Sequence, residues 1–257
     1  MKEITEWITG NVTLTVNGQP LELQMTVPAT PVKPQRMLPI FQRMTDSFVE
    51  MGASAAQARG QNVSCRAGCG ACCRQMVPVA EIETHRLAEV VAAMPEPQRS
   101  EVHERFDRAL AELAETDIFE RMSEWEGLKP DDRERIVREY FKLNIPCPFL
   151  EDESCSIHQE RPVSCREYLV TSPAEHCAEL SPEKIRRIEI PVKPSTPLRH
   201  LGQTNRVVGA DFIPLVLALR WVEKNPDRFH EKSGEEWMAD FFRILTNKTV
   251  PIPPKLP

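Results

Sequence analysis

Residues 64–73 read Ser-Cys-Arg-Ala-Gly-Cys-Gly-Ala-Cys-Cys, and this stretch decides how the chain around it folds. It places four thiols within nine residues: Cys65, Cys69, Cys72 and Cys73. The glycines at 68 and 70 let the backbone turn tightly and bring amide N–H groups close to sulfur. This composition predicts an irregular loop that wraps thiolates around an inorganic centre.

Cys72 and Cys73 are adjacent in this loop. Neighbouring side chains point in different directions, so binding both of them to one tetrahedral ion would strain the backbone. We expect one of the two to act together with Cys65 and Cys69. The other would face a second centre or pack as a small buried hydrophobe.

A second group of cysteines lies in a loop-rich stretch from residue 146 to 177. Its members are Cys147, Cys155, Cys165 and Cys177. Residues 151–154 are typical of a turn that joins two short extended pieces. Pro162 can start a helical turn that presents Cys165. With the first group, the sequence therefore predicts eight metal-ligating cysteines.

Basic side chains accompany the second group. Arg161 and Arg166 are predicted to bind the cofactor, because guanidinium groups offset the negative charge of a thiolate-bound centre. Either arginine alone would serve equally well in an ordinary surface ion pair. His158 and His176 are reserve ligands, since imidazole suits zinc and some iron sites. No catalytic residue stands out.

The cysteines are interpreted as metal ligands and not as disulfides. Residues 1–11 have no basic stretch followed by an apolar run, so we expect no signal peptide and a cytoplasmic, reducing location. The alternative is a disulfide framework in an exported protein. A net charge of -6 predicts no attraction to nucleic acid or to an anionic membrane. No apolar run is long enough to span a bilayer.

The predicted fold class is mainly α with a small β-hairpin (α+β), around an irregular cysteine-rich metal-binding centre. Apolar residues alternate over residues 12–27 about Asn17-Gly18, the pair best suited to a hairpin turn. A short strand is expected over 188–192. Helical periodicity predicts helices over 36–58, 79–93, 98–124, 131–144, 213–224 and 234–246.

Two details of these helices are specific predictions. A stripe from Met37 to Met51 should pack in the core, and Asp131 should cap the helix that follows it. The helices over 36–58, 79–93 and 131–144 should cradle the cysteines.

Three domains are predicted. Residues 1–33 form the hairpin and a linker, 34–180 form the helical cysteine-cluster domain, and 181–257 form a helical extension. The extension ends in a proline-rich tail over 251–257.

The spacing Cys-x3-Cys-x2-Cys-Cys is followed by Cys-Pro-Phe-Leu and by Cys-x-Ile-His-x-x-Arg-Pro-x-x-Cys-Arg-x-Tyr. In this order the motifs resemble the YkgJ-type cysteine-cluster family, whose CxxCxxCC domain is described as zinc- or iron-chelating. The resemblance covers residues 64–177 and implies metal chelation through cysteines. His158 departs from the family, which commonly has tyrosine there, and the change could add a ligand.

Zinc and iron–sulfur centres both take thiolate ligands. Only Cys69 and Cys72 show the Cys-x2-Cys spacing of a zinc knuckle. Three cysteines in a glycine-rich loop with a distant fourth are closer to an iron–sulfur pattern. The sequence therefore favours a [4Fe–4S]-type cluster with zinc as the alternative, and eight thiols could also serve two centres.

Three functions remain open. The chain could carry an iron–sulfur cluster with a structural or redox role, served by an unidentified redox or protein partner. It could instead chelate or traffic zinc. It could also be an enzyme, because the spacing of Cys65, Cys69 and Cys72 is similar to that of radical S-adenosylmethionine enzymes, and flagellin lysine methylases have similar cysteine clusters. The near absence of βα alternation counts against a radical enzyme built on a parallel barrel.

Overall fold

The computed structural model describes residues 6–16, 18–123, 125–179, 183–203 and 212–247. About 52% of it is helical, with a small antiparallel hairpin, which confirms the predicted α+β class. Asn17 of the predicted turn and the tail over 251–257 lie outside the described residues. No helix in the described ranges is long and apolar enough to cross a membrane.

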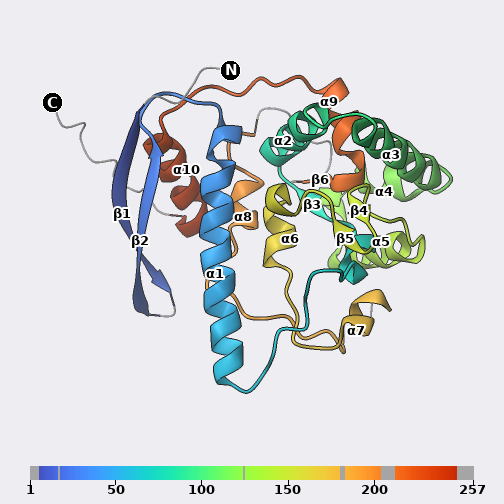
Figure 1. Ribbon diagram of the computed structural model, residues 1–257, viewed down its shortest axis with the longest axis horizontal. Helices are drawn as coiled ribbons and strands as arrows, with labels where there is room; N and C mark the ends of the chain where they lie inside the picture. Colours follow the sequence, from blue (N-terminus) through green and yellow to red (C-terminus); the bar gives the residue numbers. More distant parts are fainter. Residues whose placement is uncertain (1–5, 17, 124, 180–182, 204–211, 248–257) are drawn as a thin grey trace.

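The hairpin forms as predicted but with longer strands. Strands β1 (Trp7–Val16) and β2 (Gln19–Pro28) are antiparallel, and Leu14 lies opposite Leu21. Gly18 has a φ of 78°, a left-handed conformation that suits glycine. The alternating apolar side chains face helices α1 and α10, which lie beside the hairpin (Figure 1).

Helix α1 (Leu38–Ala58) follows a 3-10 turn, η1 (Pro34–Met37), and packs against α10 (Gly234–Thr246). Phe41 and Phe241 stack with their ring centroids 4.7 Å apart. The Met37–Met51 stripe is buried except at Ile40, which is partly buried, and at its end. Met51 is 42% exposed, because there the helix presents the neighbouring Gly52 to the carbonyl of Glu189.

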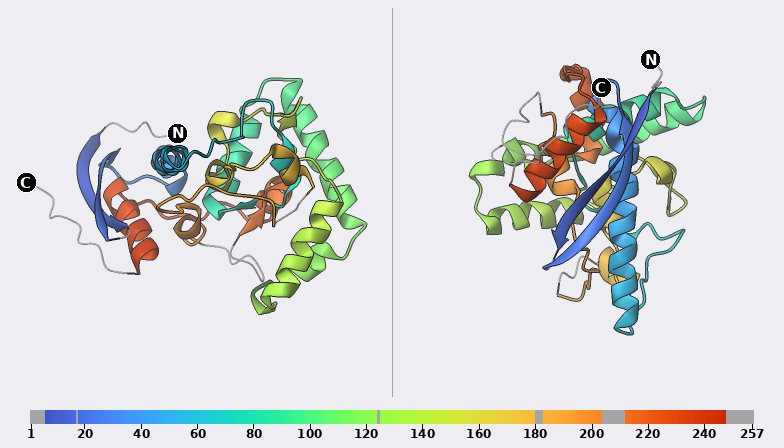
Figure 2. Two further views of the ribbon diagram at one scale, coloured as in Figure 1. Left: turned by 90° about the horizontal axis from the view of Figure 1, so that it is seen from below. Right: turned by 90° about the vertical axis from the view of Figure 1, so that its left-hand side faces the viewer.

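A second layer of helices lies on the other side of α1 (Figures 1 and 2). Its elements are β3 (Pro78–Val79), α2 (Glu81–Ala92), α3 (Gln98–Ala114), α4 (Ile118–Ser123), η3 (Trp125–Gly127), α5 (Pro130–Lys142), β6 (Ile213–Pro214), η5 (Leu215–Leu217) and α9 (Ala218–Lys224). Strands β3 and β6 are antiparallel partners.

The predicted helix over 98–124 is two helices. Thr116 interrupts it, because its hydroxyl donates to the Leu113 carbonyl at 2.8 Å and accepts from the Ile118 amide at 3.3 Å. The prediction that Asp131 caps α5 is also wrong. Lys129 holds the cap position and Pro130 begins the helix, where its missing N–H costs nothing.

Two further predictions need correction. The helix over 213–224 begins only at Ala218, because residues 213–214 pair with β3 and the Leu215 amide donates to Val77 at 2.9 Å. Residues 188–192 form no strand. The pairing stops at their start, where Arg187 forms an isolated bridge with Val170 and the Ile188 amide donates to Leu169 O at 3.0 Å. Pro191 has no amide hydrogen with which to continue it.

The cysteine-rich centre consists of short elements between the two layers. They are η2 (Ala71–Arg74), β4 (Leu150–Glu151), β5 (Ser154–Cys155), η4 (His158–Glu160), α6 (Val163–Glu167), α7 (Ala174–Ala178) and, nearer α10, α8 (Ser195–Leu198). The predicted turn over 151–154 and the helical turn after Pro162 are confirmed. The division into three domains, with boundaries at 33 and 180, stays a prediction.

Candidate metal centre

The first cysteine loop turns at its two glycines. Gly68 has a φ of 78°. A Cβ on Gly70 would lie 2.5 Å from a carboxylate oxygen of Glu153 and 3.2 Å from its Cα, so the glycine lets the two loops approach closely. Arg74 donates to Gly70 O at 3.0 Å and pairs with Glu153 at 2.6 Å. These contacts fix the first loop against the β4–β5 turn.

The cysteines of the second group lie on several different elements near the first loop. The Cys147 amide donates to Cys73 O at 2.7 Å, which joins the two groups directly. Cys155 lies on β5, and Cys165 lies on α6. Cys177 lies on α7, which packs against η2 of the first loop.

The structure therefore brings together thiols from both groups, and Cys72 is their centre. All eight cysteines are free thiols. Cys72 shares a hydrogen bond with Cys73. It also acts electrostatically on five more thiols, those of Cys65, Cys147, Cys155, Cys165 and Cys177.

The remaining thiols divide into two sets about Cys72. The charges of Cys65 and Cys69 raise the pKa of Cys177. Those of Cys147 and Cys155 raise the pKa of Cys165. The first set borders an open cavity, and the second packs against the apolar core of the second helix layer. The centre thus has one side toward solvent and one toward the interior.

Burial and crowding oppose ionisation of these thiols. Burial raises the pKa of Cys147 to about 12, and burial together with three neighbouring thiols raises the pKa of Cys165. The hydrogen bond with Cys73, followed by burial, raises the pKa of Cys72. A bound cation would reverse this balance, because a coordinating thiol loses its proton. The donor set therefore fits a thiophilic metal.

The spacing of the donors limits the kind of metal site. Within the described ranges, no three His, Cys, Asp or Glu side chains are arranged so that they could hold one metal ion. Sulfurs around one zinc ion lie about 3.8 Å from each other, as Zn–S bonds of ~2.3 Å require. Among the described residues, the thiols therefore form no preassembled site for a single ion.

The two arginines that were predicted to bind the cofactor have different surroundings. Arg166 is buried and pairs through Nη1 with both carboxylate oxygens of Asp46, at 2.8 and 2.9 Å. Its other nitrogens donate to the carbonyls of Arg161 and Gln159. Arg166 therefore holds the residues before Cys165 against α1.

Arg161 faces the thiols instead. Its charge lowers the pKa of Cys65, Cys72, Cys155 and Cys165, in each case against larger opposing effects of burial or neighbours. Its Nε is buried without a hydrogen-bond partner in the described chain. A buried donor without a partner costs free energy, so this N–H is available to a sulfur atom of a bound centre.

The two histidines lie at the edges of the site. His158 is exposed beside Cys155, in a cavity of about 550 Å³, and the charge of Arg161 lowers its pKa. His176 lies on α7, and its Nδ1 is buried without a partner among the described residues. Their role as ligands stays a prediction, as does the ligand set as a whole.

A cavity of about 770 Å³ opens beside the first loop. Cys65 and Cys69 line it, together with Arg74, Glu153 and Asn144. Polar groups and two thiols thus face a space that is large enough for a small molecule.

Sequence reasoning missed three residues that position the site. Asp46 anchors Arg166, and no pattern in its helix singled it out. Glu83 is fully buried and accepts from the amides of Ala80 at 2.8 Å and Val163 at 2.7 Å. An acidic residue in a first helical turn was the available signal. The Tyr168 hydroxyl lies against Gln75 at 3.3 Å and bonds the Cys177 thiol.

Residues 64–184 match a family model described as a "putative zinc- or iron-chelating domain" of the CxxCxxCC type. The match confirms the resemblance that the motifs predicted, over this part of the chain. The match supports chelation of zinc or iron as the function of the domain. No curated protein and no solved structure matches the chain.

Proposed function

We propose that the cysteines hold an iron–sulfur cluster, of the [4Fe–4S] type, with a structural or redox role. The observation that carries this proposal is the gathering of thiols from two separated stretches around Cys72. In a cluster each thiolate binds a different iron, so the sulfurs stand farther apart than around zinc.

The surroundings of the thiols support the same proposal. Arg161 offers a buried N–H without a partner, and hydrogen bonds to sulfur are one of the means by which proteins tune such clusters. The thiols of Cys65 and Cys69 border the solvent-facing cavity. An electron could pass to a partner docked there without crossing the apolar core.

Zinc chelation or trafficking is the alternative on the same ligands. It requires four thiols to close around one ion. The backbone bond between Cys147 and Cys73 joins the two groups, so ligands from both could take part in such a site.

The cavity beside Cys65 and Cys69 favours one further alternative, a cluster-dependent enzyme. A substrate in this space would contact the first loop directly. The sheets of the described chain are all two-stranded and antiparallel, which counts against the parallel barrel of a radical S-adenosylmethionine enzyme. Addition of S-adenosylmethionine and dithionite tests this alternative through loss of the visible absorption band.

Anaerobic purification followed by metal and acid-labile sulfide analysis tests the main proposal. We expect a brown protein with a broad band near ~400 nm and about equal iron and sulfide. A colourless protein that contains one or two zinc ions and no sulfide would replace the cluster with zinc.

The variant Cys72→Ser tests the central position of Cys72. It should lose most of the iron and sulfide, because this thiol influences the thiols of both sets electrostatically. Ser64→Ala is the matched control, since Ser64 lies in the same loop and only its backbone amide is bonded, to Val170 at 2.8 Å. Full metal content in Cys72→Ser would remove Cys72 from the ligands.

A further inference from the structure

A second cavity lies far from the cysteines. It has a volume of about 630 Å³ and opens between the loop after α8 and helix α10. Helix α10 lies beside the hairpin, on the opposite side of α1 from α7 (Figures 1 and 2). The cavity is therefore separate from the candidate metal centre, and what it binds is independent of the proposed function.

The charge of this cavity is opposite to that of the chain. The chain carries a net charge of -6. The cavity is lined by three permanent cations, Arg228, Lys232 and Arg243, against the one carboxylate of Asp240. His200 and His230 also line it. Such a local excess of positive charge attracts anions.

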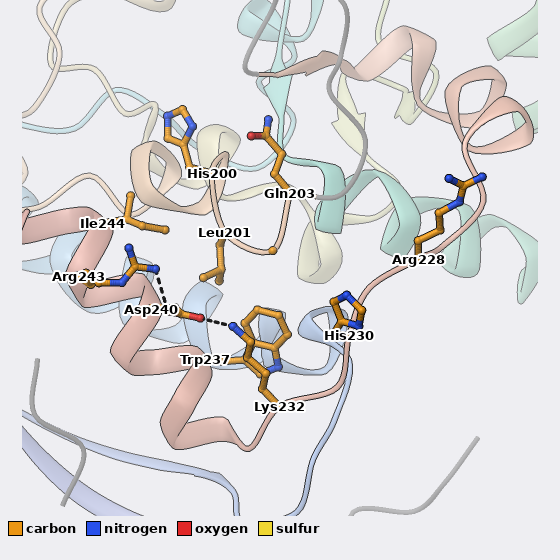
Figure 3. Close-up of a pocket in the computed structure, with 11 residues that line it drawn as sticks. His200, Leu201, Gln203, Arg228, His230, Lys232, Trp237, Asp240, Arg243 and Ile244 are labelled. Carbon is orange, nitrogen blue, oxygen red and sulfur yellow. Dashed lines mark hydrogen bonds and ion pairs between the residues drawn. The ribbon is translucent and has the colours of Figure 1, made fainter. Parts of the chain in front are cut away.

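The cations are held in place by a shared carboxylate. Asp240 pairs with Lys232 at 2.6 Å and with Arg243 at 2.9 Å, so both head groups are fixed along one rim (Figure 3). Lys232 also lies over the ring of Trp237, 4.9 Å from its centroid. Arg228 and His230, on the other rim, make no side-chain hydrogen bond or ion pair within the described residues.

The floor of the cavity is apolar and rigid. Trp237 is buried, and its Nε1 donates to Val32 O at 2.9 Å. Gly202 has a φ of 66°, and a Cβ there would lie 3.3 Å from the Trp237 ring, so the loop closes tightly on the indole. Leu201 and Ile244 complete the apolar part of the lining. A pre-formed apolar floor with polar groups around it is typical of small-molecule sites.

We propose that this cavity binds a small organic anion that carries a carboxylate or phosphate group on an apolar body. The apolar body lies on the floor of Leu201, Trp237 and Ile244. The acidic group lies between the two cationic rims, where Arg228 and His230 have donors to spare. Asp240 opposes binding through its own charge while it holds Lys232 and Arg243 in place.

Calorimetric titration of the full chain with three probes tests this proposal. Phenyl phosphate and benzoate carry the two acidic groups on the same ring, and phenol is the neutral counterpart. We expect at least one of the two acids to bind with a Kd below about 1 mM, more weakly as salt rises. The acid that binds more tightly identifies the class of ligand. Phenol that binds as tightly as both acids, or no binding of either acid up to about 10 mM, overturns the proposal.

Substitutions in the lining should change the affinity for the acid in opposite directions. Arg228→Gln and Lys232→Gln should weaken binding of the acid about tenfold. Asp240→Asn should tighten it several-fold, an effect that loss of folded structure cannot produce. Arg59→Gln, an exposed arginine at the end of α1, is the matched control and should bind as the parent does. Equal affinity in all four proteins would overturn the proposal.

Discussion

The two sides of α1 are stabilised in different ways. On one side, the hairpin and α10 form a core of stacked and interlocked rings around Phe41, Phe241 and Trp237. On the other, residues 64–75 and 146–177 are mostly loops that hold the free thiols, and part of them packs on the apolar core of the second helix layer. We infer that apolar packing alone stabilises the first side, whereas the cysteine loops of the second side also depend on what their thiols bind.

Removal of the metal should have the largest effect and should be confined to one side. Metal binding contributes about 10–16 kcal/mol in small zinc domains, and comparable coupling is expected here. After chelation under anaerobic conditions, amide hydrogen exchange should become much faster over 64–75 and 146–177. Exchange in α1 and α10 should change little. Equal acceleration on both sides would show that the two regions unfold as one unit.

Loss of a ring from the apolar side should have the next largest effect. Phe41 is fully buried, so Phe41→Ala should lower the free energy of unfolding by about 3–5 kcal/mol. Chemical denaturation measures this change. Met51→Ala, on the exposed face of the same helix, should change it by less than about 0.5 kcal/mol. Metal content per folded molecule should stay the same in both variants.

Glu83 should make the cysteine side sensitive to pH. Burial raises the pKa of this carboxyl from 4.5 to about 7. Folding therefore takes up a proton between these two values. The contribution of Glu83 to stability is complete below pH 4.5 and is lost as the pH rises through about 7.

The variant Glu83→Gln isolates this contribution. Between pH 4.5 and 7, the free energy of unfolding of the parent should fall relative to the variant by about 2–3 kcal/mol. Denaturation of both proteins at a series of pH values measures the difference. Parallel curves would mean that Glu83 stays ionised in the folded chain. Glu81→Gln, two residues earlier, provides a comparison on the same helix.

The contact between the two sides should have the smallest effect. Asp46→Asn weakens the pair with Arg166 and keeps its shape. Because Asp46 is 53% exposed, we expect a loss of only about 1 kcal/mol. Hydrogen exchange should rise in α6 and not in α10. A change confined to α1 would show that Arg166 does not transmit the contact to Cys165.

The same contrast explains how far sequence reasoning reached. Alternating residues gave the hairpin, and helical periodicity gave α1 and α10, because their partners are apolar side chains at regular spacing. The cysteine motifs indicated which thiols would gather. Interactions that depend on a single side chain, or on residues far apart in the sequence, could not be predicted. Thr116 divides a helix through its hydroxyl, Pro191 removes a strand donor, and Asp46 meets an arginine 120 residues away.

The arrangement of the thiols, on which the choice of metal depends, could not be predicted from the sequence either. The spacing of Cys69 and Cys72 predicted neither the central place of Cys72 nor the division of the other thiols into two sets. Those features depend on how α6 and α7 approach the first loop. The approach is set by Glu83, Arg166 and Tyr168 through contacts that no local pattern encodes.

The stack of Phe41 on Phe241 has a consequence for biosynthesis. The two rings are separated by 200 residues of chain, so the ribosome makes the first long before the second. At about 5–20 residues per second, that interval lasts about 10–40 seconds. Every cysteine leaves the ribosome within it, since they all lie between residues 65 and 177. Delivery of metal to the nascent chain can therefore come before the aromatic rings meet.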